Sequence, residues 1–218
     1  MGKTEENKKM KREALLSSAF ELFTEKGMQK TTISDIVKRA TLAKGTFYLY
    51  FKDKYDIRDK LIAMKGGRII EDACNALLEL IKKEHPNLSK ESDDYNFEEG
   101  IIFLADYVID HFESNKALLR FMSKNLSVAL FSGGNTEEEK NRCIEAFDKI
   151  IKVCDLEFRD ETLMFYMVIE LVNSTCYDCI IRNSPVSMDE MRPELYRAIS
   201  NIVRQFECSV SNPPLQML

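Results

Sequence analysis

Apolar residues recur along most of the chain with the 3.6-residue period of amphipathic helices, and no segment shows the alternation of a convincing strand. The first such stretch ends at Gly27, a residue that favours a helix C-terminus. A short second helix begins at Thr32, which forms a capping-box pattern with Asp35. A third short helix ends near Tyr50. The N-terminal part is therefore predicted to hold three helices.

Longer helices follow these three. We expect them over about residues 54–83, 97–112, 116–130, 137–154, 161–182 and 188–206. The segment 161–182 is apolar around most of its circumference, which predicts cover on more than one side. The pattern as a whole predicts an all-α protein of about nine helices. Residues 9–69 form a three-helix DNA-binding domain in this interpretation, and residues 70–212 form a helical ligand-binding and dimerisation domain.

Charge is unevenly distributed along the 218 residues, whose net charge is −5. Residues 1–65 hold 15 Lys and Arg against 9 Asp and Glu, which gives +6, and the rest hold 16 against 27, which gives −11. A basic first third suits nucleic-acid binding, while phosphate would repel the acidic remainder. The longest uninterrupted apolar runs are far shorter than the roughly 20 residues of a membrane span. We therefore expect a soluble, cytoplasmic protein with no membrane partner.

Cysteine and histidine usage gives little support to an enzyme. The six cysteines are scattered through helical segments, which favours reduced, buried thiols. Cys176 and Cys179 have the spacing of a metal or redox motif, but this alternative lacks a second pair and a neighbouring histidine. The two histidines, His85 and His111, accompany no nucleophile elbow, phosphate-cradling loop or ligand cluster. No catalytic residue, metal site or cofactor is predicted.

Residues 31–51 have the layout of a helix-turn-helix, whose second helix enters the major groove of DNA. Phe47 and Phe51 lie four residues apart and can anchor that helix in a core. Lys44 and Tyr48 then fall on a different face, where a cation and a phenol can reach phosphates or base edges. The residues that we expect to contact DNA are Thr31, Thr32, Thr41, Lys44, Gly45, Thr46, Tyr48, Tyr50 and Lys54.

The order of these residues resembles the N-terminal signature of the tetracycline-repressor (TetR-like) family. That signature has an aliphatic and aromatic first helix, a glycine, a threonine-rich second helix start, and the ending Lys-Gly-Thr-aromatic-Tyr-x-Tyr-Phe-x-x-Lys. Residues 9–69 match it closely, and the rest matches only in helical layout. The resemblance implies three DNA-binding helices, a regulatory core of about six helices and a dimer built largely from the last two. Thr41 stands where the family often has glycine, and Ala43 where it often has Ser or Thr.

These features predict a DNA-binding transcriptional regulator, in the simplest form a ligand-responsive repressor that binds a palindromic double-stranded DNA operator as a homodimer. An adaptor whose helical domain responds to a protein partner is the alternative. The expected small-molecule effector contacts, each of which could instead bond within the protein or face water, are Tyr107, His111, Asn125, Tyr166, Glu170, Asn173 and Tyr177. The apolar stripe expected at the dimer interface consists of Met191, Leu195, Ile199, Ile202 and Phe206.

Gly66 and Gly67 are adjacent within the helix expected over residues 54–83. Each glycine in a helix interior costs roughly 1 kcal/mol relative to alanine, so the pair is a candidate hinge between the DNA-binding head and the regulatory core. Close packing of another helix against the glycines is the alternative. Replacement of both by alanine distinguishes the two ideas.

Overall fold

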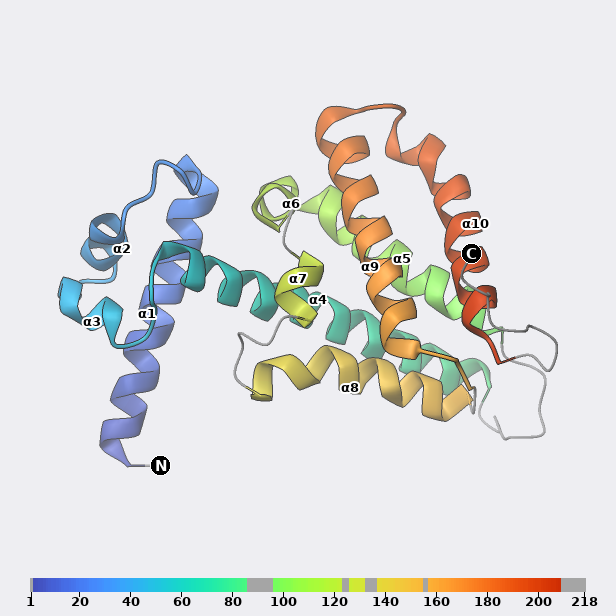
Figure 1. Cartoon of the computed structure of the whole chain (residues 1–218), viewed down its shortest axis with the longest axis horizontal. Helices are drawn as coiled ribbons and strands as arrows, with labels where there is room; N and C mark the ends of the chain where they lie inside the picture. Colours follow the sequence, from blue (N-terminus) through green and yellow to red (C-terminus); the bar gives the residue numbers. More distant parts are fainter. Residues whose placement is uncertain (1, 86–95, 123–125, 132–136, 155–156, 209–218) are drawn as a thin grey trace, which may run out of the picture. The chain divides into compact units, whose positions relative to one another are not determined.

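The chain is helical in the computed structural model, which describes residues 2–85, 96–122, 126–131, 137–154 and 157–208 (Figure 1). The all-α prediction is confirmed, and within the described ranges one isolated β-bridge joins Phe158 and Glu207. The helices fall into two compact units. The first unit comprises Met1–Gly67 and Asn115–Lys140, and the second unit comprises Arg68–Ser114 and Asn141–Leu218.

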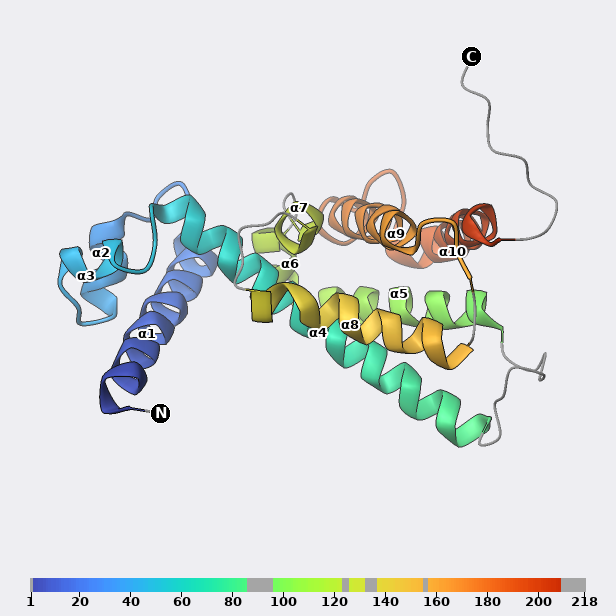
Figure 2. The same ribbon diagram turned by 60° about the horizontal axis from the view of Figure 1, so that its bottom comes forward.

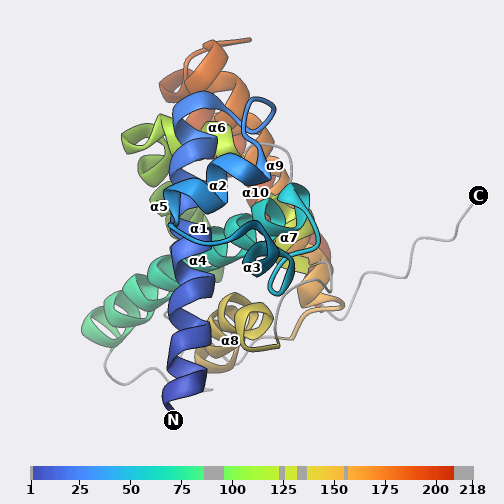
Figure 3. The ribbon, with the colours of Figure 1, turned by 90° about the vertical axis from the view of Figure 1, so that its left-hand side faces the viewer.

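The first unit is built around the N-terminal helices. It contains α1 (Lys3–Lys26), α2 (Ile33–Arg39), α3 (Lys44–Tyr48), the beginning of α4 (Lys54–Glu84), α6 (Lys116–Met122) and α7 (Leu126–Phe131). Figure 3 shows α2 and α3 beside α1. The apolar stripe of α1 packs with Ile36, Phe47, Phe51 and Leu61, all of which are fully buried. This core gives α3 a fixed support.

Local signals in the sequence set the ends of α1 and α2. Gly27 follows α1 with a φ of 82°, a conformation that side chains with a Cβ rarely adopt. The Thr32 hydroxyl accepts a hydrogen bond from the Asp35 amide at 3.1 Å, and the Asp35 carboxylate accepts one from the Thr32 amide at 2.9 Å. The predicted stop and the predicted capping box are both confirmed.

Helices α6 and α7 belong to the same unit as the N-terminal helices, whereas the sequence predicts one later domain from residue 70 onward. Phe121 of α6 meets two rings of α1, edge-on to Phe20 at 5.4 Å and stacked on Phe23 at 5.9 Å between centroids. The single helix expected over residues 116–130 is described as α6 and α7, which lie on either side of residues 123–125.

The second unit is a layered helical domain. It contains the rest of α4, α5 (Phe97–Ser114), most of α8 (Glu137–Cys154), α9 (Glu161–Cys176), the π-helix η1 (Tyr177–Arg182) and α10 (Met188–Phe206). In Figure 2, α9 and α10 lie side by side, with α5 next to them. The Phe147 ring of α8 stacks on Phe165 of α9 at 4.1 Å. A capping box formed by Ser187 and Glu190 begins α10.

The apolar stripe of α10 does not form the free surface that the sequence analysis expected. Leu195, Ile199 and Phe206 are buried within the single chain, at 3%, 0% and 3% exposure. Neighbouring helices of the same chain therefore cover these three side chains, and the assignment of the stripe to a dimer interface stays a prediction. Met191 and Ile202 are half-buried, so part of each side chain is still accessible to a second copy of the chain.

The stretch Glu161–Arg182 is long and apolar enough, by length and composition alone, to cross a membrane. The expectation of no membrane span rested on uninterrupted apolar runs and overlooked this helix. Half of its apolar window is buried inside the second unit. That burial is typical of a core helix in a globular domain, and it agrees with the prediction that this segment is covered on more than one side.

Candidate nucleic-acid interface

The short helix α3 presents one face to the core and the other to solvent. Phe47 and Phe51 anchor it, with exposures of 0% and 2% and ring centroids 5.6 Å apart. Lys44, Gly45 and Tyr48 are exposed on the other side. The predicted division between anchoring and outward-facing residues is confirmed. The Lys44 ammonium group, the Gly45 backbone and the Tyr48 phenol therefore lie on the exposed face of a helix that two buried rings hold in place.

Thr41 forms the turn between α2 and α3 in a left-handed conformation. Its φ is 54°, which is uncommon for a β-branched residue. The Thr41 hydroxyl donates to the carbonyl of Ala40 at 2.7 Å, and the Leu42 amide donates to Val37 at 2.9 Å. Ala43 then caps α3 without a side-chain hydrogen bond. The two positions at which the chain departs from the family signature are thus the turn residue and the helix cap.

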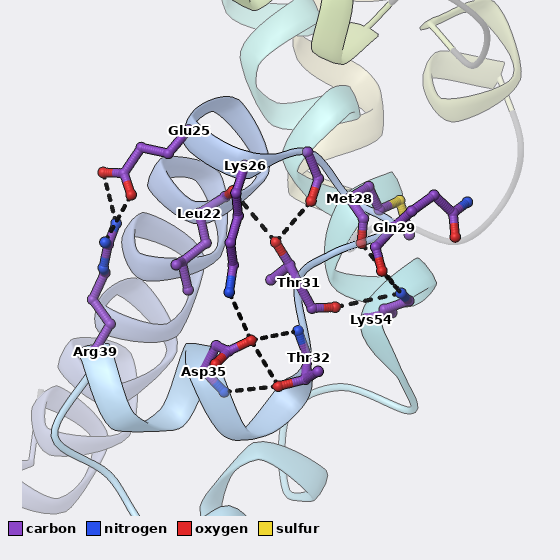
Figure 4. A network of polar contacts seen from close by, with 11 residues as sticks. Leu22, Glu25, Lys26, Met28, Gln29, Thr31, Thr32, Asp35, Arg39 and Lys54 are labelled. Atoms are coloured by element: carbon purple, nitrogen blue, oxygen red, sulfur yellow. Dashed lines mark hydrogen bonds and ion pairs between the residues drawn. The ribbon is translucent and has the colours of Figure 1, made fainter.

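Two ion pairs attach α2 to the end of α1 (Figure 4). Both guanidinium nitrogens of Arg39 donate to the Glu25 carboxylate, at 2.9 and 2.8 Å. The ammonium group of Lys26 donates to Asp35 at 2.8 Å. The hydrogen bond from Arg39 lowers the pKa of Glu25, and the bonds from Lys26 and Thr32 hold the pKa of Asp35 well below its usual range. These contacts fix the orientation of α2 and, through the turn, of α3.

Two of the predicted DNA contacts are structural residues instead. Thr31 is fully buried, and its hydroxyl donates to the carbonyl of Gly27 at 2.9 Å, so its side chain cannot reach DNA. The Lys54 ammonium group donates to the carbonyls of Met28 at 3.2 Å, Gln29 at 3.4 Å and Thr31 at 3.4 Å. Because an ammonium group has three donors, these bonds use its capacity in closing the loop between α1 and α2.

The remaining predicted contacts stay on the accessible side of the helix-turn-helix. Thr32 and Thr41 are exposed, although the Thr32 hydroxyl is engaged in the cap of α2. Thr46 and Tyr50 are half-buried. These four residues therefore stay candidates for DNA contact beside the exposed face of α3.

The predicted effector contacts occupy several helices of the second unit. Tyr107 and His111 lie one turn apart on α5 and are half-buried. The Tyr166 hydroxyl donates to the Glu170 carboxylate at 3.5 Å on α9. Tyr177 lies in η1, where the Arg182 guanidinium is 5.1 Å from its ring centroid. The predicted contact Asn125 lies outside the described residues.

Asn173 differs from the other effector candidates because it is deeply buried. Its side chain is 3% exposed, and Oδ1 has no hydrogen-bond partner among the residues that the structure describes. An unpaired amide oxygen in an apolar interior costs roughly 1–3 kcal/mol. Polar groups of this kind are rare in folded proteins and call for a specific reason, such as a partner that arrives from outside the chain.

An ion-pair cluster between α5 and α10 escaped the sequence analysis. The Arg192 guanidinium pairs with Asp106, with Asp110 at 2.7 Å and with Glu113. The Tyr196 hydroxyl also donates to Asp106. The signal was present, since residues 106, 110 and 113 have the spacing of one helix face. The contacts hold α10 against α5.

The thiols of Cys176 and Cys179 are buried within α9 and η1. Burial raises the pKa of Cys176 to about 12 and also raises the pKa of Cys179. Thiolates bind metals and attack disulfides, so a raised pKa disfavours both kinds of chemistry here. Over the described ranges, no group of three or more His, Cys, Asp or Glu side chains could hold a metal ion.

Comparison with known proteins matches residues 15–61 to the family model described as bacterial regulatory proteins, tetR family. An uncharacterised HTH-type transcriptional regulator, YvdT of Bacillus subtilis, is 57% identical over 44 residues, which are 20% of this chain and 23% of that protein. The fatty acid metabolism regulator protein of Bacillus subtilis is 42% identical over 57 residues, 26% of this chain and 29% of that protein. These two matches thus span only about a quarter of the relatives' length.

Solved structures extend the likeness to the whole fold. A TetR transcriptional regulator from Rhodococcus sp. RHA1 has a TM-score of 0.59 at 17% identity, over 88% of this chain and 94% of that chain. Thermus thermophilus FadR, a TetR-family transcriptional repressor in complex with lauroyl-CoA, also has a TM-score of 0.59 at 17% identity, over 94% and 99% of the two chains. Residues 15–61 thus match the tetR family of bacterial regulatory proteins, and the chain shares its all-helical fold with solved TetR regulators.

Proposed function

We propose that the chain is a cytoplasmic transcriptional regulator that binds double-stranded DNA through α3. The observation that carries the proposal is the exposed set Lys44, Gly45 and Tyr48 on a helix anchored by fully buried phenylalanines. A lysine can contact phosphate or a guanine edge, a glycine permits close backbone approach and a phenol can donate to phosphate. The proposed contact surface consists of Thr32, Thr41, Lys44, Gly45, Thr46, Tyr48 and Tyr50.

A homodimer on a palindromic operator is part of the proposal. Leu163 and Met167 lie one turn apart on α9 and are 46% and 36% exposed. Such an apolar surface is suited to a second copy of the chain, with Met191 and Ile202 of α10 as half-buried additions. A two-fold dimer reads two half-sites, so its operator is an approximate palindrome. This surface adds residues of α9 to the α10 stripe that the sequence predicts at the interface.

The second unit, in this proposal, binds a small-molecule effector that releases the repressor from DNA. The buried, unpaired Oδ1 of Asn173 supports an effector that donates a hydrogen bond. The half-buried pair Tyr166 and Glu170 lies on the same helix and offers further polar contacts. Release by an added small molecule, in the absence of any other protein, separates this function from that of an adaptor.

The test is DNA binding by the full chain, using duplexes selected from a random-sequence library and fluorescence anisotropy over a range of salt concentrations. Lys44→Ala should weaken binding, and loss of one phosphate contact from each protomer should lower the magnitude of the log K against log salt slope by about 1.8 for the dimer. Lys152→Ala is the matched control, because Lys152 is an exposed lysine of the second unit. Equal binding by both variants would remove α3 from the interface, and absence of any selected duplex would overturn the proposal.

A further inference from the structure

A groove of about 690 Å³ separates the first turns of α1 from the residues that follow α3. Its lining is rich in lysine and has no acidic side chain. It consists of Lys3, Thr4, Asn7, Lys8, Lys11, Leu49 and Tyr50. The groove lies within the first unit.

The spacing of the α1 residues explains why one side of the groove is basic. Positions 3, 4, 7, 8 and 11 share one face of a helix, and their side chains are exposed. Glu5 and Glu6, also in the first two turns, are not part of the lining. Lys9 lies on the opposite face, because it is about half a turn away from the middle of the lining residues. Three lysines at the N-terminal end of α1, Lys3, Lys8 and Lys11, therefore place their positive charge in the groove.

The other side of the groove continues the proposed DNA surface. Leu49 and Tyr50 directly follow α3, and Leu49 is 79% exposed. Tyr50 is half-buried and is one of the proposed DNA contacts. The lysines of the groove lie N-terminal to residues 15–61, the part that matches the family model.

We propose that this groove receives the phosphate backbone of DNA next to the half-site bound by α3. Lys3, Lys8 and Lys11 contact phosphates, and the exposed Leu49 side chain lies against the sugars. Anionic phosphates complement three lysines with no facing carboxylate, and long-range attraction of this kind also speeds association. The inference rests on the proposed DNA-binding function and adds a second contact region to each half-site.

The experiment compares Lys8→Gln/Lys11→Gln with Lys9→Gln in the full-length protein. The probe is a duplex selected by the wild-type chain, used at its minimal length and with about 10 additional base pairs, one helical turn, at each end. The double variant should lower the magnitude of the salt slope by about 3.6 for the bound dimer, or 0.9 for each of the four lost phosphate contacts, with unchanged base preference. It should also lose the affinity gained from the longer duplex. Lys9→Gln should bind as the wild type does.

Two different failures are distinguishable. If the double variant and Lys9→Gln have equal salt slopes while Lys44→Ala still weakens binding, the groove proposal is overturned and the proposed function stands. If the wild-type chain binds no duplex, the proposed function fails, and the groove proposal fails with it. Altered base preference in the double variant would also contradict a role confined to the backbone. Circular dichroism checks that the exposed substitutions leave the helices intact.

Discussion

Gly66 of α4 packs directly beneath Leu126 of α7. A methyl group at position 66 would approach Cδ1 of Leu126 far more closely than carbon atoms do, and would lie 3.0 Å from Cε of Met122. At position 67 the nearest atom would be Cδ2 of Leu130 at 3.8 Å, an ordinary contact. The two adjacent glycines therefore have different surroundings. Close packing accounts for Gly66, and only Gly67 is left as a candidate hinge.

This difference predicts different effects of alanine at the two positions. Gly66→Ala forces the side-chain ends of Leu126 and Met122 to move, at a cost of about 1 kcal/mol that offsets the gain in helix propensity. Gly67→Ala gains the propensity without the clash. The free energies of unfolding of the two variants, measured with urea, should differ by roughly 1 kcal/mol. A difference near zero would contradict the packing interpretation, and altered DNA affinity in a stable Gly67→Ala variant would support a hinge.

Thr41→Gly should stabilise the first unit. A non-glycine residue in the left-handed region costs roughly 1–2 kcal/mol, and the φ of Thr41 is 54°. Glycine removes this strain but loses more chain entropy on folding, so we expect a net gain of about 1 kcal/mol in the free energy of unfolding. Thr41→Ala keeps the Cβ and is the matched control. Equal free energies of unfolding for the two variants would show that backbone strain at Thr41 does not reduce the stability of the first unit.

Asp35 should make stability depend on pH on the acid side. Its folded-state pKa is lowered, first by the hydrogen bond from Lys26 and then by those from Thr32. The stabilisation is therefore fully present above the unfolded-state pKa of about 3.9 and is lost as pH falls through the lower folded-state value. Asp35→Asn should flatten the acid limb of a plot of unfolding free energy against pH. An NMR titration in which the Asp35 carboxyl has an ordinary pKa would contradict this.

The sequence predicted elements whose signals are local. The capping box at Thr32 and Asp35 and the split faces of α3 depend on neighbouring residues in one helix, and both are observed. The roles of Lys54 and Thr31 depend instead on carbonyls from the loop between α1 and α2. A sequence identifies a cation or a hydroxyl, but it does not show which distant acceptors the fold brings to it.

The stripe of α10 illustrates a second limit. Its periodic apolar residues correctly indicated that one face is buried, and Ile199 is indeed fully buried. An apolar face gives no information about whether the same chain or a second copy covers it. The placement of Phe121 beside Phe20 and Phe23 is also a long-range packing outcome, and it assigns α6 to the first unit rather than the second.

Cysteine reactivity tests the environment of the Cys176 and Cys179 pair. Burial raises the pKa of Cys154 to about 11 and of Cys176 to about 12. Both thiols therefore stay protonated near about pH 8 and react slowly with a thiol reagent. Cys208 is exposed. In a Cys143→Ser background, a thiol reagent should modify one cysteine rapidly in the folded protein and all five after unfolding. Rapid modification of Cys176 or Cys179 would contradict the burial and reopen a redox role.

Asn173→Leu separates a residue kept for structure from one kept for a ligand. Because Oδ1 of Asn173 is buried without a partner, an apolar side chain of similar size should raise the free energy of unfolding by about 1 kcal/mol. The same change should abolish stabilisation by any small molecule that hydrogen-bonds this oxygen, measured as the shift in melting temperature across a metabolite library. Wild-type protein provides the reference shift, and Ser174→Ala, a change at an exposed position of α9, is the control for nonspecific effects on this helix. A less stable Asn173→Leu variant that keeps its ligand response would assign Asn173 to the scaffold and remove it from the effector site.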